Sequence, residues 1–234
     1  MESVSGSTKV SRPAGLPGLI DALHGEIVLR YAAGARVVDI GHGSPEIARW
    51  TAEVAESATL LDRDTWEADA QGAIRLPLPD RAFDLAVCLR TLPHVGTDPD
   101  SSQVAARTLL AEAARVTAPG GHVLVEIDNP QSLRGFAQGI RNPRTIVRTN
   151  VLRGEGNEID RYDTLARLLD LIPPTLDFVR VHAARTVIAL PRTLELPLVG
   201  RLLGWVEWWA RDAPILRRFG AHLLVVLRRT AEAA

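Results

Sequence analysis

The sequence predicts an α/β fold with a doubly wound, mainly parallel sheet. Short β-branched or apolar runs alternate with segments of helical spacing over the first half of the chain. A Gly-His-Gly turn follows the first of these runs, at residues 41–43. Two more strand-like runs lie near the end of the chain, with a long segment between them. Strands separated by helices favour parallel pairing through right-handed crossovers.

The first elements are predicted in the order helix, strand, helix, strand. Residues 16–31 carry apolar side chains at helical spacing and precede Gly34, which suits a helix C-terminus. The β-branched run 36–40 is the first strand, and 58–62 is the second. Residues 44–55 form the helix that connects them.

The centre of the chain repeats this alternation. Residues 83–89 (FDLAVCL) are the third predicted strand, and 104–116 have helical spacing. The turn Pro-Gly-Gly at 119–121 then leads into a strand over 122–127.

The sequence of the last third of the chain predicts strands that run antiparallel to each other. A helix is expected over 162–171, and strands over 176–190 and 221–229, with a 191–220 insertion between the two strands. Two terminal strands joined in this way can form an antiparallel pair on an otherwise parallel sheet. A helical insertion therefore precedes an antiparallel C-terminal strand.

The composition is that of a single globular domain, expected over 1–234 with 1–15 flexible. Hydrophobic residues make up 46% and charged residues 24% of the 234 residues. A formal net charge of −1 argues against a nucleic-acid partner. The single cysteine, Cys88, excludes an intramolecular disulfide and a thiolate metal cluster, and no metal is expected. This cysteine usage, and a polar start that is unlike a leader peptide, favour the cytoplasm.

The glycine turn follows a strand and an acid, Asp39, and opens a helix. Glycines at 41 and 43 allow positive φ and close backbone approach, so the turn can hold an adenosine-containing ligand; a tight turn without a ligand is the alternative. Asp62 ends the second strand, where an acid can accept hydrogen bonds from both ribose hydroxyls. Ser44 and Pro45 suit the N-cap and first position of the next helix.

Two later motifs extend this pattern: LPLPDRAFD at 76–84 and RVTAPGG at 115–121, each before a predicted strand. The ordered series over 36–128, with a looser match to 229, resembles the class I S-adenosylmethionine-dependent methyltransferases. The resemblance implies a Rossmann-like, seven-stranded sheet and S-adenosylmethionine as cofactor. Two departures are that Pro45 replaces the third glycine of the family and that only 13 residues separate Asp62 from Leu76.

A nicotinamide-binding domain is the rival interpretation of the glycine turn. It would need a third Gly or Ala where Glu46 stands, and it does not explain the two later motifs. The chain also lacks a Gly-x-Ser-x-Gly elbow and a His/Cys cluster with metal spacing, so hydrolase and metalloenzyme functions are not favoured.

The resemblance also implies the site residues. The acceptor side would involve Asp128, and His94 is the base candidate because its reference pKa lies near neutrality. A purely structural His94 is the alternative. The predicted cofactor-binding residues are Asp39, Gly41, His42, Gly43, Asp62, Arg63, Leu89, Arg90 and His94.

An arginine-rich segment lies within 130–175, which the resemblance makes the cover of the acceptor side. Residues 130–153 contain five arginines and no acid. Arginine forks suit phosphate or carboxylate, which predicts an anionic acceptor bound by Arg134, Arg141 and Arg144; a solvated basic face is the alternative.

The insertion 191–220 is rich in leucine and tryptophan, with arginines close behind. Such a helix can lie in a membrane interface or close over a lipid-linked substrate, and equally can pack on the sheet, form a lid or make a dimer contact. Similar insertions occur in methyltransferases of glycan and secondary-metabolite biosynthesis, which favours a sugar-containing acceptor.

The leading hypothesis is therefore a small-molecule methyltransferase. One alternative is a protein of this fold that binds the cofactor but catalyses another reaction. Another is a non-catalytic partner protein that docks through its Trp-rich insertion. The oligomeric state is left open by the sequence.

Overall fold

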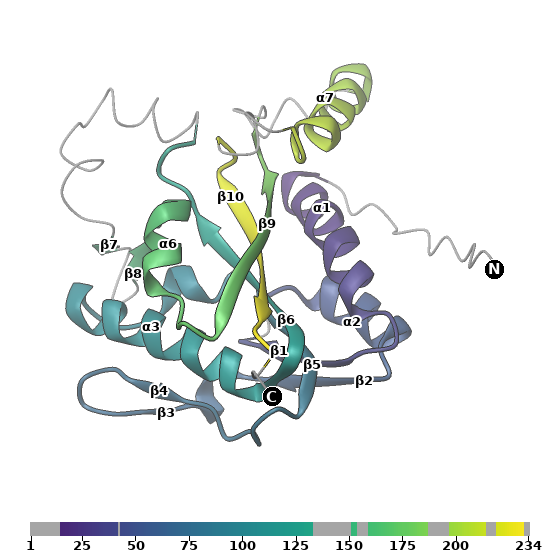
Figure 1. Ribbon diagram of the computed structural model, residues 1–234. Coiled ribbons are helices and arrows are strands. Elements are labelled where there is room, and N and C mark those ends of the chain that lie inside the picture. The colour runs from purple at the N-terminus through teal and green to yellow at the C-terminus, as the bar shows by residue number, and fades with distance from the viewer. Residues whose placement is uncertain are drawn as a thin grey trace.

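The computed structural model describes residues 15–41, 43–132, 151–153, 159–186, 197–213 and 219–231. Within these residues the central sheet has six strands in the order β2-β1-β5-β6-β10-β9 (Figure 1). Strands β2, β1, β5 and β6 pair in parallel, whereas β10 is antiparallel to both of its neighbours, β6 and β9. The predicted mainly parallel sheet with an antiparallel C-terminal strand is thus confirmed. The sheet strands are β1 (Arg36–Ile40), β2 (Ser57–Leu61), β5 (Phe83–Cys88), β6 (Thr117–Asp128), β9 (Leu176–Ala184) and β10 (His222–Arg229).

The expected seventh strand is wrong for the part of the chain that the structure describes. The 13 residues between Asp62 and Leu76 are too few for a crossover helix and another sheet strand. They form a single 3₁₀ turn, η1 (Arg63–Thr65), and a small antiparallel hairpin of β3 (Glu67–Ala68) and β4 (Ile74–Arg75). Strand β2 therefore lies at the edge of the described sheet, where Leu60 is exposed.

The helices cover both faces of the sheet, as a doubly wound fold requires (Figure 1). On one face, α1 (Gly15–Ala32) and α2 (Pro45–Val54) pack over a core that includes Val37, Leu85 and Leu224. On the other, α3 (Pro99–Val116) and α6 (Leu165–Leu171) pack over Val38, Ala86 and Val225. The alternation along each strand follows the period of two of β structure.

Local sequence explains where these elements begin. Asp98 caps α3: its side chain accepts hydrogen bonds from the amides of Asp100 and Ser101, and Pro99 occupies the first helical position. The Pro119–Gly121 segment lies within β6, where the pairing with β5 shifts register and Gly120 has a φ of 82°. The expected turn is thus an irregularity inside a longer strand.

The acceptor-side and C-terminal segments are described in part. The strands β7 (Val151–Arg153) and β8 (Ile159–Arg161) form a second hairpin. The expected strand over 176–190 is shorter than predicted: β9 ends at Ala184, and the next residue, Arg185, has a φ of 57°. Residues 187–196 lie outside the described residues. The insertion contains α7 (Pro197–Ala210), which confirms its predicted helical character.

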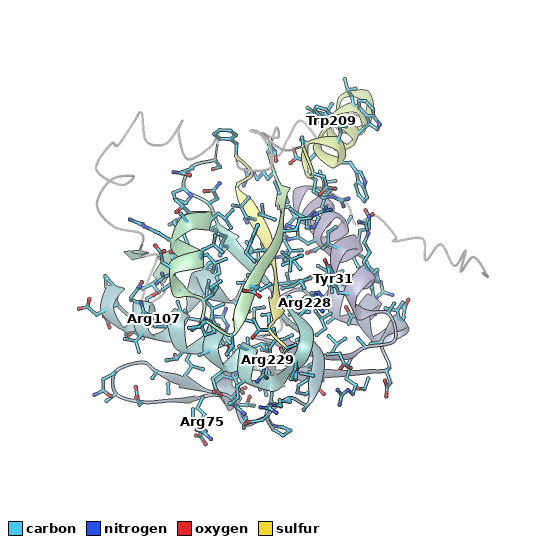
Figure 2. The ribbon with its side chains drawn as sticks, viewed as in Figure 1. Tyr31, Arg75, Arg107, Trp209, Arg228 and Arg229 are labelled. Carbon is cyan, nitrogen blue, oxygen red and sulfur yellow. The ribbon has the colours of Figure 1, made fainter. Side chains whose placement is uncertain are left out.

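Helix α7 lies beyond the end of the sheet at which β9 ends and β10 begins (Figure 1). Its Leu203 and Trp208 pack against the cluster of Ile20 and Leu23 of α1 with Ala184 of β9, whereas Trp205 and Trp209 are exposed. Figure 2 shows Trp209 on this helix, at the opposite end of the view from Arg229. None of the described helices has the length and apolar character needed to cross a membrane.

Candidate functional site

The glycine turn lies at the carboxyl ends of β1 and β2. Ile40, the last residue of β1, pairs with Leu61, the last residue of β2, and the amide of Gly41 donates to the Leu61 carbonyl at 2.8 Å. This register brings Gly41 and Asp62 to the same edge of the sheet. Asp62 is exposed there, whereas Asp39 is buried within β1.

The two glycines of the turn are required by the neighbouring β5 segment. Gly41 has a φ of 91°, and a Cβ at this position would lie 2.6 Å from Thr91 Oγ1. A Cβ on Gly43 would lie 1.8 Å from the Leu89 carbonyl oxygen. The backbones of the turn and of the β5 exit therefore touch directly, and this close approach is a reason for the glycines besides space for a ligand. His42 lies outside the described residues.

Ser44 and Pro45 open α2 as predicted from their residue types. Ser44 has extended backbone angles and its hydroxyl accepts a hydrogen bond from the Ile47 amide at 3.4 Å. Pro45 is the first helical residue and is exposed. The same Ser44 hydroxyl donates to Asp21 Oδ1 of α1 at 3.0 Å, so the helix cap is tied to a second helix.

Arg90 and Asp21 hold this turn in place. The Arg90 guanidinium donates to Asp21 Oδ1 at 2.5 Å and to the Gly43 carbonyl at 3.3 Å. Burial raises the pKa of Asp21, and the charge of Arg90 together with the Ser44 hydrogen bond opposes that rise. Arg90, predicted to contact the cofactor, thus supports the glycine turn; Asp21 was not predicted.

Arg63 bridges the ends of β2 and β5. Its guanidinium donates to the carbonyls of Arg90 at 3.0 Å, Thr91 at 3.1 Å and His94 at 3.4 Å. An arginine in this place brings a planar cation to the same edge as Asp62.

His94 lies in the 3₁₀ turn η2 (Leu92–His94), directly after β5. Its Nδ1 is 3.3 Å from Asp160 Oδ1 and 3.4 Å from the Ile159 carbonyl, both in β8. Its side chain is 43% exposed. A role of His94 as base stays a prediction.

A cluster of two carboxylates and two histidines lies where the end of β6 and the start of β10 meet the middle of α1. Glu126 of β6 is buried, with its carboxylate 3.6 Å from His24 Nδ1 of α1 and 3.5 Å from His222 Nδ1 of β10. His222 Nδ1 is also 2.8 Å from Asp128 Oδ1. Burial would raise the pKa of Glu126, but His24, His222 and Arg90 hold it at about 2, so Glu126 is ionised in a buried position.

The structure thus gathers most of the described predicted residues at one edge of the sheet. Gly41, Gly43, Asp62, Arg63, Leu89 and Arg90 surround the turn, and Asp128 lies at the end of the neighbouring strand β6. Arg134, Arg141 and Arg144 lie outside the described residues. His24 and His222 were missed because no spacing along the sequence places them beside Glu126.

The chain resembles known proteins in sequence and in fold. Residues 25–125 match the family model described as a methyltransferase domain. No curated protein matches the chain.

Solved structures share the fold at low sequence identity. An S-adenosylmethionine-dependent methyltransferase from Mesorhizobium loti aligns with a TM-score of 0.54 at 18% identity, over 92% of this chain and 100% of its own. A SAM-dependent methyltransferase from Thermotoga maritima aligns with a TM-score of 0.50 at 18% identity, over 90% and 93%. A Haloferax volcanii chain, from a complex with the Trm112 methyltransferase activator, aligns with a TM-score of 0.50 at 18% identity, over 92% and 93%.

Proposed function

We propose that this chain, which carries the domain and fold of the class I S-adenosylmethionine-dependent methyltransferases, methylates a small anionic molecule. The observation that carries the proposal is the edge of the sheet at which Gly41 and Asp62 lie side by side, next to the β5 exit. Motifs that lie far apart in the sequence meet at this edge, which supports the proposal.

The residues at this edge fit an adenosine-containing cofactor. The exposed carboxylate of Asp62 would accept hydrogen bonds from the ribose hydroxyls, and the backbone of the 41–43 turn would lie along the amino-acid portion. Arg63 would close over the adenine, because its planar guanidinium can stack on an aromatic ring. Pro45 is exposed on the first turn of α2, where its missing amide costs no helical hydrogen bond.

S-adenosylmethionine supplies a methyl group activated by a sulfonium. The chain's own residues therefore need to orient the acceptor in line with that methyl and exclude water, and to take a proton only if the acceptor must lose one. The Asp21–Arg90 pair contributes by fixing the glycine turn against the β5 exit.

The charge distribution supports a small anionic acceptor such as a nucleotide, a phosphosugar or a carboxylated metabolite. The chain has a formal net charge of −1, which does not favour nucleic acid, whereas residues 130–153 carry five arginines and no acid. The single cysteine supports a cytoplasmic location, and a biosynthetic pathway is the setting we favour.

Replacing Arg141 and Arg144 by glutamine is expected to raise the KM for the acceptor about tenfold or more and to leave the Kd for S-adenosylmethionine unchanged. Each lost charge-assisted hydrogen bond is worth roughly 1.5–3 kcal/mol. Formation of S-adenosylhomocysteine, measured with a panel of phosphosugars, nucleotides and carboxylated metabolites, provides the test. Arg49→Gln on the exposed face of α2 is the matched control. An unchanged KM would contradict the anionic acceptor, and turnover of uncharged members of the panel alone would do the same.

A further inference from the structure

His222 lies at the carboxyl edge of the sheet because β10 runs antiparallel to β6. The first residue of β10, His222, pairs with the last residue of β6, Asp128, and Leu224 pairs with Glu126. Leu124 and Leu224 belong to the core beneath α1. Since alternate residues of a strand share a face, Glu126, Asp128 and His222 all lie on the α1 side of the sheet.

The imidazole of His222 is enclosed by acids on one side and open on another. Its Nδ1 is buried against Asp128 and Glu126, at 2.8 Å and 3.5 Å, while 24% of the side chain is exposed. Burial lowers the pKa of His222, but the adjacent Asp128 and then the charge of Glu126 outweigh burial and the charge of Arg185, so the pKa is raised. His24 of α1 faces Glu126 from the opposite side.

This cluster is continuous with the cofactor turn. Arg90 donates to the Gly43 carbonyl and to Asp21, and its charge also acts on Glu126. Glu126 in turn contacts His222. A short series of charged side chains therefore connects the glycine turn to an imidazole at the same edge of the sheet.

We infer that His222, with Asp128 and Glu126 behind it, is the general base that deprotonates the methyl acceptor. The inference rests on the proposed methyl transfer. His94, the base candidate from the sequence, has a less favourable setting: its side chain is 43% exposed, and one carboxylate, that of Asp160, lies beside it. Two carboxylates stabilise the protonated form of His222, one of them buried.

The proton transfer balances without any further reagent. The acceptor's O–H or N–H bond breaks, and its proton forms a bond to the exposed nitrogen of the His222 ring. The electron pair stays on the acceptor atom and forms the new bond to the methyl carbon. The imidazolium, paired with Asp128, afterwards releases the proton to water and returns the ring to its neutral form.

The first experiment needs no acceptor. Imidazole NMR titration of the purified chain, with the His222 signal assigned through His222→Gln, should give a His222 pKa above the ordinary value of about 6.5. Asp128→Asn and Glu126→Gln should each lower that pKa, because each removes a negative charge from the ring. A His222 pKa at or below the ordinary value, or one unmoved by Asp128→Asn, would overturn the inference.

The second experiment uses the acceptor that the panel identifies. His222→Gln should lower kcat on the order of 100-fold, the usual range for loss of a general base, with an unchanged Kd for S-adenosylmethionine. In the wild type, kcat/KM should rise with pH and level off above the His222 pKa, since only the neutral ring accepts a proton. In Asp128→Asn the plateau should begin at lower pH.

A matched control lies on the same pair of strands. His122, in the middle of β6, packs on Tyr31 and pairs with Arg228, and His122→Gln should retain wild-type activity; Figure 2 labels Tyr31 and Arg228. Full activity in His222→Gln would overturn the inference while leaving methyl transfer intact. Loss of methyl-transfer activity on EDTA treatment, with recovery of activity on adding Mg²⁺, would also overturn the inference. The oxygen and nitrogen atoms of Glu126, Asp128 and His222 lie within 4.8 Å of one another, so these residues could hold a cation instead. A wild type that forms no S-adenosylhomocysteine would count against the proposed function, not against the titration result.

Discussion

Replacing Gly43 by alanine is expected to weaken S-adenosylmethionine binding on the order of 100-fold and to lower the Tm. The new Cβ would lie 1.8 Å from the Leu89 carbonyl oxygen and 2.6 Å from its carbon, and both belong to the backbone. Because neither atom can rotate away, the glycine turn has to move from the β5 exit, and displacements of about 1 Å cost about 10²-fold in positioned sites. Calorimetric titration and a thermal melt measure both effects.

Gly204→Ala provides the control for this change. Gly204 lies inside α7, and a Cβ there would meet nothing within 4 Å. Alanine should leave cofactor binding unchanged and raise stability by up to about 1 kcal/mol, since it is the better helix former. Wild-type affinity and Tm in Gly43→Ala would show that the turn does not touch the β5 segment as described.

Replacing Asp163 by asparagine is expected to lower the free energy of unfolding by about 3–5 kcal/mol, the usual cost of leaving a buried charge without its partner. Arg161 and Asp163 are both buried, and Arg161 Nη2 donates to Asp163 Oδ1 at 3.0 Å. The same arginine donates to the Ser102 carbonyl of α3 at 3.2 Å. The amide of Asp163 bonds to the Asp128 carbonyl, so the pair also fixes β8 to the end of β6. Urea unfolding gives the value.

An exposed ion pair on α2 sets the baseline for that measurement. Glu53 accepts a hydrogen bond from Arg49 one turn earlier, and both side chains are at least half exposed. Glu53→Gln should change the free energy of unfolding by less than about 1 kcal/mol, because surface pairs are solvated. Equal losses in Asp163→Asn and Glu53→Gln would contradict the importance of burial for the Arg161–Asp163 pair.

Much of the fold can be predicted from local patterns in the sequence. The β-branched run 36–40 coincides with β1, and Ser44-Pro45 correctly indicates the start of α2. The described residues lack the seventh strand that the family resemblance implies, because only 13 residues separate Asp62 from Leu76. A segment of that length forms a hairpin more readily than a crossover.

The site residues were predictable where they follow directly after a strand of the parallel sheet. They were less predictable where they depend on the pairing of two distant strands. Gly41, Gly43 and Asp62 follow from strand ends, which in a parallel sheet share one edge. His222 beside Asp128 depends on the antiparallel register of β10 with β6, which no residue type specifies. His24 did carry a signal: it adjoins the apolar face formed by Ile20, Leu23 and Ile27, and a polar group buried in this way needs partners.

The central claim is that the edge bearing the glycine turn and Asp62 binds S-adenosylmethionine. Calorimetric titration of the purified chain with S-adenosylmethionine and S-adenosylhomocysteine tests it most directly. We expect both to bind at one site per chain, with a Kd about 10–100-fold weaker in Asp62→Asn, which loses charge-assisted hydrogen bonds, and unchanged in Glu56→Gln just before the other end of β2. Absence of binding of either compound, or equal affinity in Asp62→Asn, would contradict the claim.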